Sequence, residues 1–163
     1  EGTFVASEYS LGFDGLINYY ADCEKVIESD FSEEFIAQTG YSSKFAYPYV
    51  VKDSEELLER IAQDDMVRGV TISAPGFYGP QGRAIRLPLA DAGLNNKIIG
   101  FDYKGHKVTN FEMEGSAIAG LSAMLGHKAL TICLIIANRF GKRFIGDYKP
   151  YMKKLIETVL DRI

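Results

Sequence analysis

The run from Ala129 to Ala137 is apolar at every position except Thr131. A strand with one face in water alternates polar and apolar residues, so a continuous apolar strand is typical of a sheet covered on both faces. The run is far too short to cross a bilayer. Helical patterns lie between this segment and the other strand patterns of the chain. We therefore expect one layered α/β domain over residues 1–163.

Local signals place the other elements. Pro48 interrupts an aromatic, β-branched segment and favours an edge strand there. Asp53 followed by Glu56 resembles the capping box of a helix. Gly126 is suited to close one helix and Pro150 to open the last one. We expect strands at residues 3–7, 41–51 and 67–73, a hairpin over 98–110 that turns at Lys104-Gly105, and helices at 16–28, 53–63, 113–125 and 150–163.

Composition and charge exclude several functions. The net charge is −4 and no run of Lys or Arg exists, so the electrostatic footprint of a nucleic-acid-binding protein is absent. Cys23 and Cys133 lie far apart and favour reduced thiols in a cytoplasmic protein over a disulfide. His106 and His127 lack the spacing of metal ligands, so we expect no metal site. No secretion signal is visible, and we expect no membrane partner.

The strongest functional pattern is the triplet Glu112-Met113-Glu114, where a polar hairpin gives way to an apolar helix. A carboxylate at this junction can accept two hydrogen bonds from a vicinal diol, and such charge-assisted bonds are strong. The Met113 thioether offers an adaptable surface for a sugar ring. The helix macrodipole also favours acidic residues at an N-terminus, so a purely structural role stays open.

A second pattern is the segment Phe77-Tyr78-Gly79-Pro80-Gln81-Gly82-Arg83, which follows the strand expected at 67–73. Open α/β sheets place their ligands at the carboxyl ends of strands. The Gln81 amide can accept from an imide N–H and donate to the adjoining carbonyl, the pair that uracil presents. Arg83 can donate to the other carbonyl, and Phe77 can stack on the base. A flexible Gly/Pro loop with incidental polar groups is the alternative interpretation.

A third pattern, Ile135-Ile136-Ala137-Asn138-Arg139, ends the apolar run. An arginine that emerges there can lie behind a base pocket and hold Gln81 and Arg83, directly or through water. A surface arginine at a strand end is the alternative.

Together the three patterns resemble the uridine phosphorylases of the nucleoside phosphorylase superfamily. In that family a Phe-Tyr-x-x-Gln-x-Arg loop holds the pyrimidine, a Glu-Met-Glu triplet holds the ribose, and an Asn-Arg pair follows the next strand. The resemblance implies a three-layer fold with a mixed central sheet flanked by helices. Purine-specific relatives carry Ser-Asp where this chain has Asn138-Arg139. A guanidinium cannot serve as the acid that protonates a purine, so we expect a pyrimidine.

The resemblance implies phosphorolysis of uridine to uracil and ribose 1-phosphate by a homo-oligomer, a dimer or a hexamer, with phosphate as co-substrate and no cofactor. Arg83 and Glu114 would be the catalytic residues. Arg83 would take up the negative charge that develops on uracil, and Glu114 would favour the cationic sugar. The residues expected to contact the base are Phe77, Gln81, Arg83, Ile136 and Arg139, and those expected to contact the ribose are Glu112, Met113 and Glu114.

The family binds phosphate with a Gly-Thr-Ser-Gly-like turn and arginines in its first half, and it borrows a histidine and an arginine from a neighbouring subunit. This chain opens at Glu1 in a strand-like segment without an initiator methionine. We therefore expect it to be the C-terminal part of a longer polypeptide, without the family's N-terminal strands or phosphate-binding residues. Two alternatives stay open: a catalytically inactive fragment, and a nucleosidase that hydrolyses the N-glycosidic bond.

Overall fold

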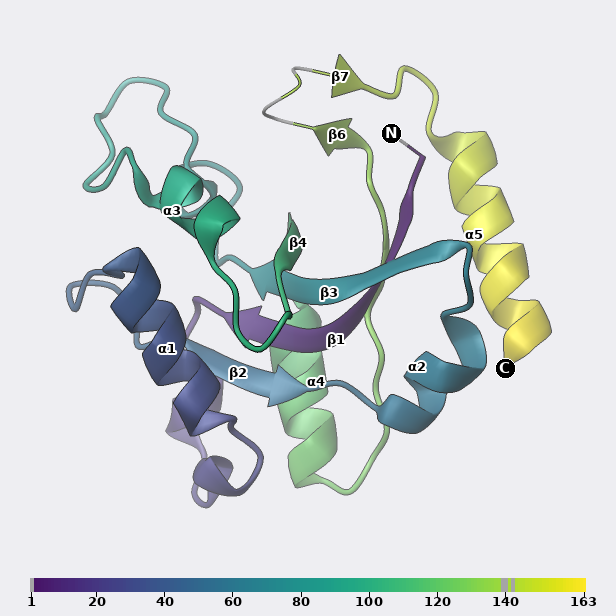
Figure 1. The fold of residues 1–163 in the computed structure, drawn as a ribbon, viewed down its shortest axis with the longest axis horizontal. Helices are drawn as coiled ribbons and strands as arrows, with labels where there is room; N and C mark the ends of the chain where they lie inside the picture. The colour runs from purple at the N-terminus through teal and green to yellow at the C-terminus, as the bar shows by residue number, and fades with distance from the viewer. Residues whose placement is uncertain (1, 139–140, 142) are drawn as a thin grey trace.

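The structure is a computed structural model that describes residues 2–138, 141 and 143–163. At its centre lies a mixed sheet in the order β2-β1-β3-β4, with β5 also paired to β1 (Figure 1). β1, β3 and β4 run parallel, whereas β2 and β5 run antiparallel to β1. The strands are β1 (Phe4–Gly12), β2 (Tyr49–Lys52), β3 (Met66–Ser73), β4 (Val108–Glu112) and β5 (Ile132–Leu134), and a separate ribbon joins β6 (Ala137–Asn138) to β7 (Arg143–Phe144).

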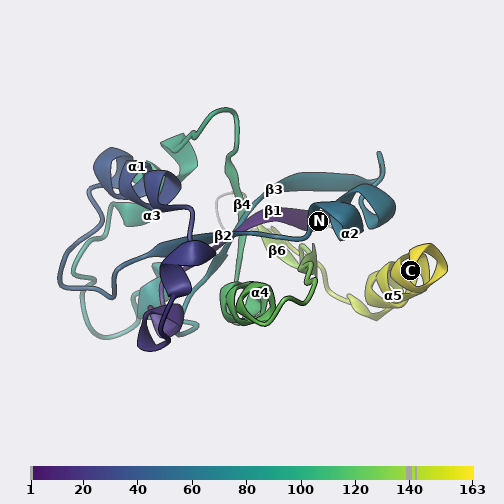
Figure 2. The ribbon, with the colours of Figure 1, turned by 90° about the horizontal axis from the view of Figure 1, so that it is seen from below.

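Helices cover both faces of this sheet. Seen edge-on, α1 (Ser29–Thr39) and α3 (Leu94–Gly100) lie on one side and α4 (Gly115–Met124) lies on the other (Figure 2). Near the start of β3, α2 (Glu55–Ile61) packs beside α5 (Lys149–Arg162). The expected α/β fold, a mixed sheet flanked by helices, is thereby confirmed.

The core is divided by the sheet into separate apolar clusters. The cluster beneath α1 and α3 is aromatic, with Phe31 stacked on Tyr103 at 4.2 Å between ring centroids. The cluster beneath α4 joins Ile17, Tyr49 and Val51. Burial on both faces fixes β1 and β3 in the middle of the sheet, so their carboxyl ends are held by packing on each side.

Several local predictions are confirmed. The chain turns at Lys104 (φ 53°) and Gly105 (φ 90°), α4 is followed by Gly126 in the left-handed conformation (φ 73°), and proline stands in the first turn of α5. The strand expected at 67–73 is β3, and the strand expected at 3–7 continues to Gly12 as β1. The edge strand expected around Pro48 begins only after that proline, as β2.

Other predictions are wrong. Residues 16–28 form two short 3-10 turns, η1 (Leu16–Tyr19) and η2 (Cys23–Lys25), rather than a helix. Asp22 between them has a left-handed backbone (φ 63°), and Tyr19 is 88% exposed, so the periodic apolar residues do not share a buried face. The first arm of the expected hairpin belongs instead to α3, and α1 was not expected. α2 is capped by Ser54, which accepts from Leu57 N at 3.4 Å, rather than by Asp53.

The apolar run 129–137 also differs from its prediction. Residues 132–134 form β5, in which only Leu134 is buried, and Ala137 at the end of the run begins β6. β5 pairs with three residues of β1, Phe4 to Ala6. The expected strand covered on both faces is therefore a short strand with half-exposed side chains.

Candidate active site

The carboxyl ends of the three parallel strands meet at one edge of the sheet. Gly12 of β1 lies beside Ser73 of β3, and Ser73 lies beside Glu112 of β4. Immediately beyond them, Ala74 N donates to Glu112 O at 3.0 Å and Phe13 N donates to Ser73 O at 2.9 Å. The glutamine–arginine loop leaves β3 and the acidic triplet leaves β4, so these two sequence patterns start side by side.

The loop after β3 holds its three predicted residues in one cluster. Gln81 is 4% exposed and ends the 3-10 turn η3 (Gly79–Gln81). Arg83 Nη1 donates to Gln81 Oε1 at 2.7 Å and to the Phe77 carbonyl. The guanidinium carbon lies 3.6 Å from the centroid of the Phe77 ring, a cation–π contact. Phe77, Gln81 and Arg83 therefore form one unit with an exposed aromatic ring.

The positive charge of Arg83 makes this cluster suited to binding a negatively charged group. Burial lowers the pKa of Arg83 below its usual range, with the Tyr78 hydroxyl opposing that shift. An arginine stays charged at neutral pH all the same. A half-buried guanidinium attracts negative charge more strongly than one in bulk water, because less solvent screens it.

The two acids of the triplet differ: the Glu112 carboxylate is hydrogen-bonded within the protein, whereas Glu114 is exposed. The Glu112 carboxylate accepts from Ser73 Oγ with one oxygen and from Glu114 N and Gly115 N, both at 2.7 Å, with the other. Met113 is 40% exposed. Glu114 is exposed, and its carboxylate makes no hydrogen bond or ion pair with any described residue. The acid that can receive a ligand is therefore Glu114.

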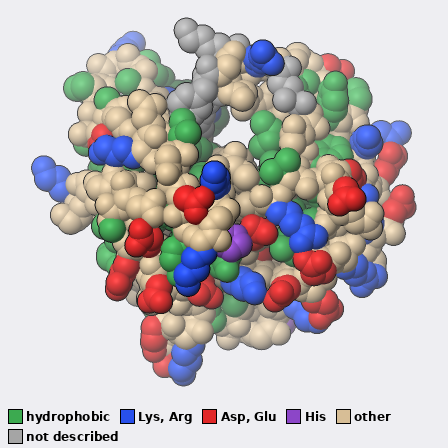
Figure 3. Space-filling view, in the orientation of Figure 1, with side chains coloured by type: hydrophobic (Ala, Val, Ile, Leu, Met, Phe, Trp, Pro, Cys, Tyr) green, Lys and Arg blue, Asp and Glu red, His purple; other side chains and the backbone are tan. Residues whose placement is uncertain are grey.

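The third pattern lies at a different place in the topology. Because β5 runs antiparallel to β1, Ile136 leaves near the start of β1, where Ile135 N donates to Thr3 O at 2.9 Å. Ile136 is 38% exposed, and its carbonyl accepts from Ile145 N at 2.9 Å. Arg139 lies outside the described residues. In the space-filling view, the molecule is hollowed between the end of β4 and β6 (Figure 3).

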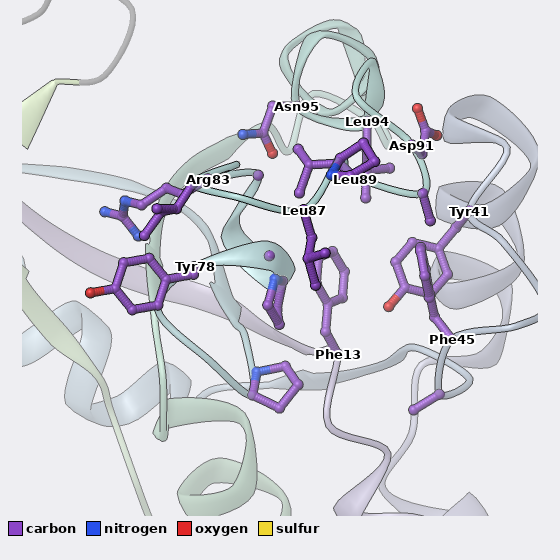
Figure 4. A pocket seen from close by; sticks show the side chains of 18 of the residues that line it. Phe13, Tyr41, Phe45, Tyr78, Arg83, Leu87, Leu89, Asp91, Leu94 and Asn95 are labelled. Carbon is purple, nitrogen blue, oxygen red and sulfur yellow. The ribbon is translucent and has the colours of Figure 1, made fainter.

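A cavity of about 730 Å³ opens on the other side of the loop. Tyr78 and Arg83 stand along one side of it, Phe13 and Leu87 in the middle, and Tyr41 and Phe45 opposite (Figure 4). Among the predicted residues that the structure describes, only Arg83 lines this cavity. It is therefore separate from the end of β4, where the acidic triplet lies.

Sequence reasoning missed the buried polar groups beneath this edge. Asp14, Tyr49 and Ser116 form a hydrogen-bonded cluster, and burial raises the pKa of the Tyr49 hydroxyl. Asp53 accepts from Ser10 Oγ at 2.7 Å and Thr131 N at 3.2 Å, and burial raises its pKa to about 7. The available signal for Asp14 and Asp53 was a polar residue shortly after a strand, which resembles an ordinary turn residue.

The part of the chain that the structure describes contains neither a metal-binding cluster nor a membrane-spanning helix. No group of three or more His, Cys, Asp and Glu side chains there is arranged to hold a metal ion. The same residues contain no helix that is long and apolar enough to span a bilayer. Cys133 is not activated as a nucleophile, because burial raises the pKa of its thiol to about 11.

The fold and the strand-end residues define an α/β protein whose candidate ligand groups gather at the carboxyl edge of a mixed sheet. The model of the phosphorylase superfamily matches residues 1–159, and the chain belongs to that family.

Uridine phosphorylases are among its relatives. The chain is 34% identical over 82 residues to a uridine phosphorylase of Thermococcus kodakarensis, a match that covers 47% of this chain and 27% of that protein. It is 30% identical over 100 residues to the inactive uridine phosphorylase B of Schistosoma mansoni, covering 55% of this chain and 30% of that protein.

A solved structure matches nearly the whole chain. A Trypanosoma brucei nucleoside phosphorylase that shows uridine phosphorylase activity superposes with a TM-score of 0.80 at 27% identity. The match covers 98% of this chain and 57% of that one. This chain therefore spans little more than half of that relative's length.

Proposed function

We propose that the protein to which this chain belongs cleaves uridine by phosphorolysis, giving uracil and ribose 1-phosphate. The observation that carries the proposal is the placement of Gln81 and Arg83 after β3 beside Glu114 after β4, at adjoining ends of parallel strands. The family and its uridine phosphorylase relatives support the same reaction class. Uridine as the substrate, an active oligomer and the residue roles below are parts of this proposal.

In the proposed reaction, a phosphate oxygen forms a bond to ribose C1′ while the bond from C1′ to uracil N1 breaks. The electron pair of that bond passes to uracil and spreads over its ring carbonyls. In this proposal Arg83 and Gln81 donate to those carbonyls, and donors fixed before the reaction stabilise the transition state more than the ground state. Phe77 is exposed, as a ring that stacks on a base has to be.

At the sugar end, the Glu114 carboxylate accepts hydrogen bonds from the ribose 2′- and 3′-hydroxyls, and its charge favours the cationic, oxocarbenium-like sugar. Met113 packs against the ribose, and Glu112 supports the acid beside it. Ile136 and Arg139 complete the base pocket, and phosphate is held by residues outside this chain. Asn138-Arg139 in place of Ser-Asp supports a pyrimidine as the base.

The test is phosphate-dependent release of uracil from uridine, measured for the complete gene product and for the 163-residue chain alone. We expect activity only in the complete protein, because the family's phosphate-binding segment lies in its first half. Equal uracil release without phosphate would assign the protein to the nucleosidases. No release by the complete protein under either condition would identify it as inactive, and turnover by the 163-residue chain would contradict the assignment of the phosphate site.

A further inference from the structure

The proposed reaction gives no role to Ser73, which lies at the centre of a buried polar network beside the acidic triplet. Ser73 is fully buried at the end of β3. Its hydroxyl donates to Glu112 Oε1 and accepts from Ser116 N at 2.7 Å. One hydroxyl therefore joins the last residue of β4 to the first turn of α4, on either side of Glu114.

The carboxylate of Glu112 completes this connection. Its Oε2 accepts from Glu114 N and Gly115 N, which are amides at the start of α4. Such amides have no partner within a helix. A side chain at Gly115 would bring Cβ within 2.7 Å of Thr131 Oγ1 and 3.2 Å of the Glu112 carboxyl carbon. The backbone is therefore pressed against the carboxylate, and only glycine fits without a shift.

A second layer holds Ser116 from beneath. Ser116 Oγ donates to Asp14 Oδ2 at 3.1 Å, and the Tyr49 hydroxyl lies 3.0 Å from both Asp14 Oδ1 and Ser116 Oγ. Tyr49 and Ser116 are fully buried. Gly12 leaves room for this layer, since a Cβ there would overlap the Tyr49 ring. The network thus runs from the end of β1 to the triplet without reaching the surface at Ser73 or Ser116.

We propose that Ser73 is a positioning residue for the sugar end of the site. By bonding Glu112 and the Ser116 amide together, it fixes the backbone on both sides of Glu114 and so orients the acid of the triplet that has no partner among the described residues. Glu112 then acts on the backbone rather than on the ribose. The identity of the ligand rests on the proposed function, whereas the positioning itself does not. Fixing a binding group in advance reduces the ordering cost of ligand binding.

The first experiment measures amide hydrogen exchange and needs no ligand. In the complete gene product, Ser73→Ala is expected to speed exchange at Glu114, Gly115 and Ser116 by about tenfold, the effect of losing one buried hydrogen bond. Ser32→Ala is the matched control. Ser32 is also buried, and its hydroxyl accepts from Val50 N at 3.1 Å, but it belongs to α1, on the other side of the sheet from α4 (Figure 2). Unchanged exchange at the three amides in Ser73→Ala would overturn the proposal.

The second experiment compares binding of uridine with binding of 2′,3′-dideoxyuridine, which lacks the diol. If Ser73 acts through Glu114, Ser73→Ala reduces the preference for uridine by about tenfold, while Ser32→Ala changes it less than about twofold. A purely structural role would weaken both ligands equally, and that result would contradict the proposal. If the wild type fails to bind uridine, the proposed function fails, and the exchange experiment still decides the positioning.

A third variant guards against misfolding of Ser73→Ala. Glu112→Gln can keep the amide-accepting oxygen and let its NH₂ group donate to Ser73 Oγ, which reverses the native hydrogen bond, while it removes the charge. It is expected to reduce the uridine preference much less than Glu112→Ala. Equal losses in the two variants would mean that the charge of Glu112 acts on the ligand, and would overturn its assignment to the backbone.

Discussion

Gln81 is the residue whose removal tests the base-binding assignment. Its side chain is buried and accepts from Arg83. Gln81→Ala removes one of the two hydrogen-bond acceptors of Arg83 Nη1 and leaves polar groups unpaired. We expect the barrier for uridine cleavage by the complete protein to rise by about 1–3 kcal/mol. This corresponds to a fall in kcat/KM of about 5- to 150-fold, measured by uracil release. Gln63→Ala, at an exposed glutamine, is the control, and equal turnover in the two variants would refute the assignment.

Asp53 predicts how stability depends on pH. Burial raises its pKa to about 7 from an ordinary 3.8, although bonds from Ser10 and Thr131 oppose the shift. The folded state thus binds a proton that the unfolded state releases. The contribution of this group to stability is fully present below about pH 4 and is lost as the pH rises through 7.

The corresponding experiment is chemical unfolding at pH 5 and pH 8. Asp53→Asn keeps an oxygen for Thr131 N and offers an N–H to Ser10, but it does not titrate. The difference in unfolding free energy between variant and wild type should shift in favour of the variant by about 2–4 kcal/mol between the two pH values. A difference that is independent of pH would show that Asp53 titrates normally.

Among the helices and strands, the sequence predicted those that one local pattern is enough to determine. Each of β3, α4 and α5 has a clear apolar pattern and a residue that marks one of its ends. These are the Gly/Pro loop after β3, Gly126 after α4 and Pro150 in the first turn of α5. Residues 16–28 have helical spacing as well, but Asp22 adopts a left-handed backbone and the segment is held by tertiary contacts. α1 was missed although Phe31 and Phe35 are one helical turn apart and buried, because polar residues between them dilute the pattern.

Gly82 predicts a conformational requirement of the loop that carries Gln81 and Arg83. It has φ +74°, and a Cβ there would overlap the side-chain amide of Asn95. That amide donates to Gln81 O at 3.2 Å. Gly82→Ala would therefore strain the backbone at a positive φ and also displace the Asn95 side chain from Gln81 O. We expect a loss of about 1–2 kcal/mol in uridine binding. Gly79→Ala, in the same loop with open space around it, should lose clearly less in the same titration. Equal losses would mean that any added side chain harms the loop.

At the scale of the whole molecule, the candidate site depends on strand order. The sequence predicted the loop and the triplet as separate patterns, each after its own strand. Their meeting requires that β3 and β4 be parallel neighbours with Ser73 beside Glu112. Such pairing joins residues that are far apart in the chain, so no local sequence pattern predicts it. For the same reason the sequence does not show that β5 runs antiparallel to β1, which brings Ile136, two residues beyond the end of β5, near the start of β1.

The outer surface predicts self-association of the 163-residue chain. α5 buries Leu155 against α2, yet Ile156, Leu160 and Ile163 are 52%, 66% and 62% exposed. Exposed apolar side chains that gather on one element mark an interaction surface. We expect the mass measured by sedimentation equilibrium to rise with concentration in the micromolar range. Replacing Ile156 and Leu160 by Glu should keep the chain monomeric, whereas Lys154→Glu, on the same helix, should leave association intact. A chain that stays monomeric at every concentration would contradict this prediction.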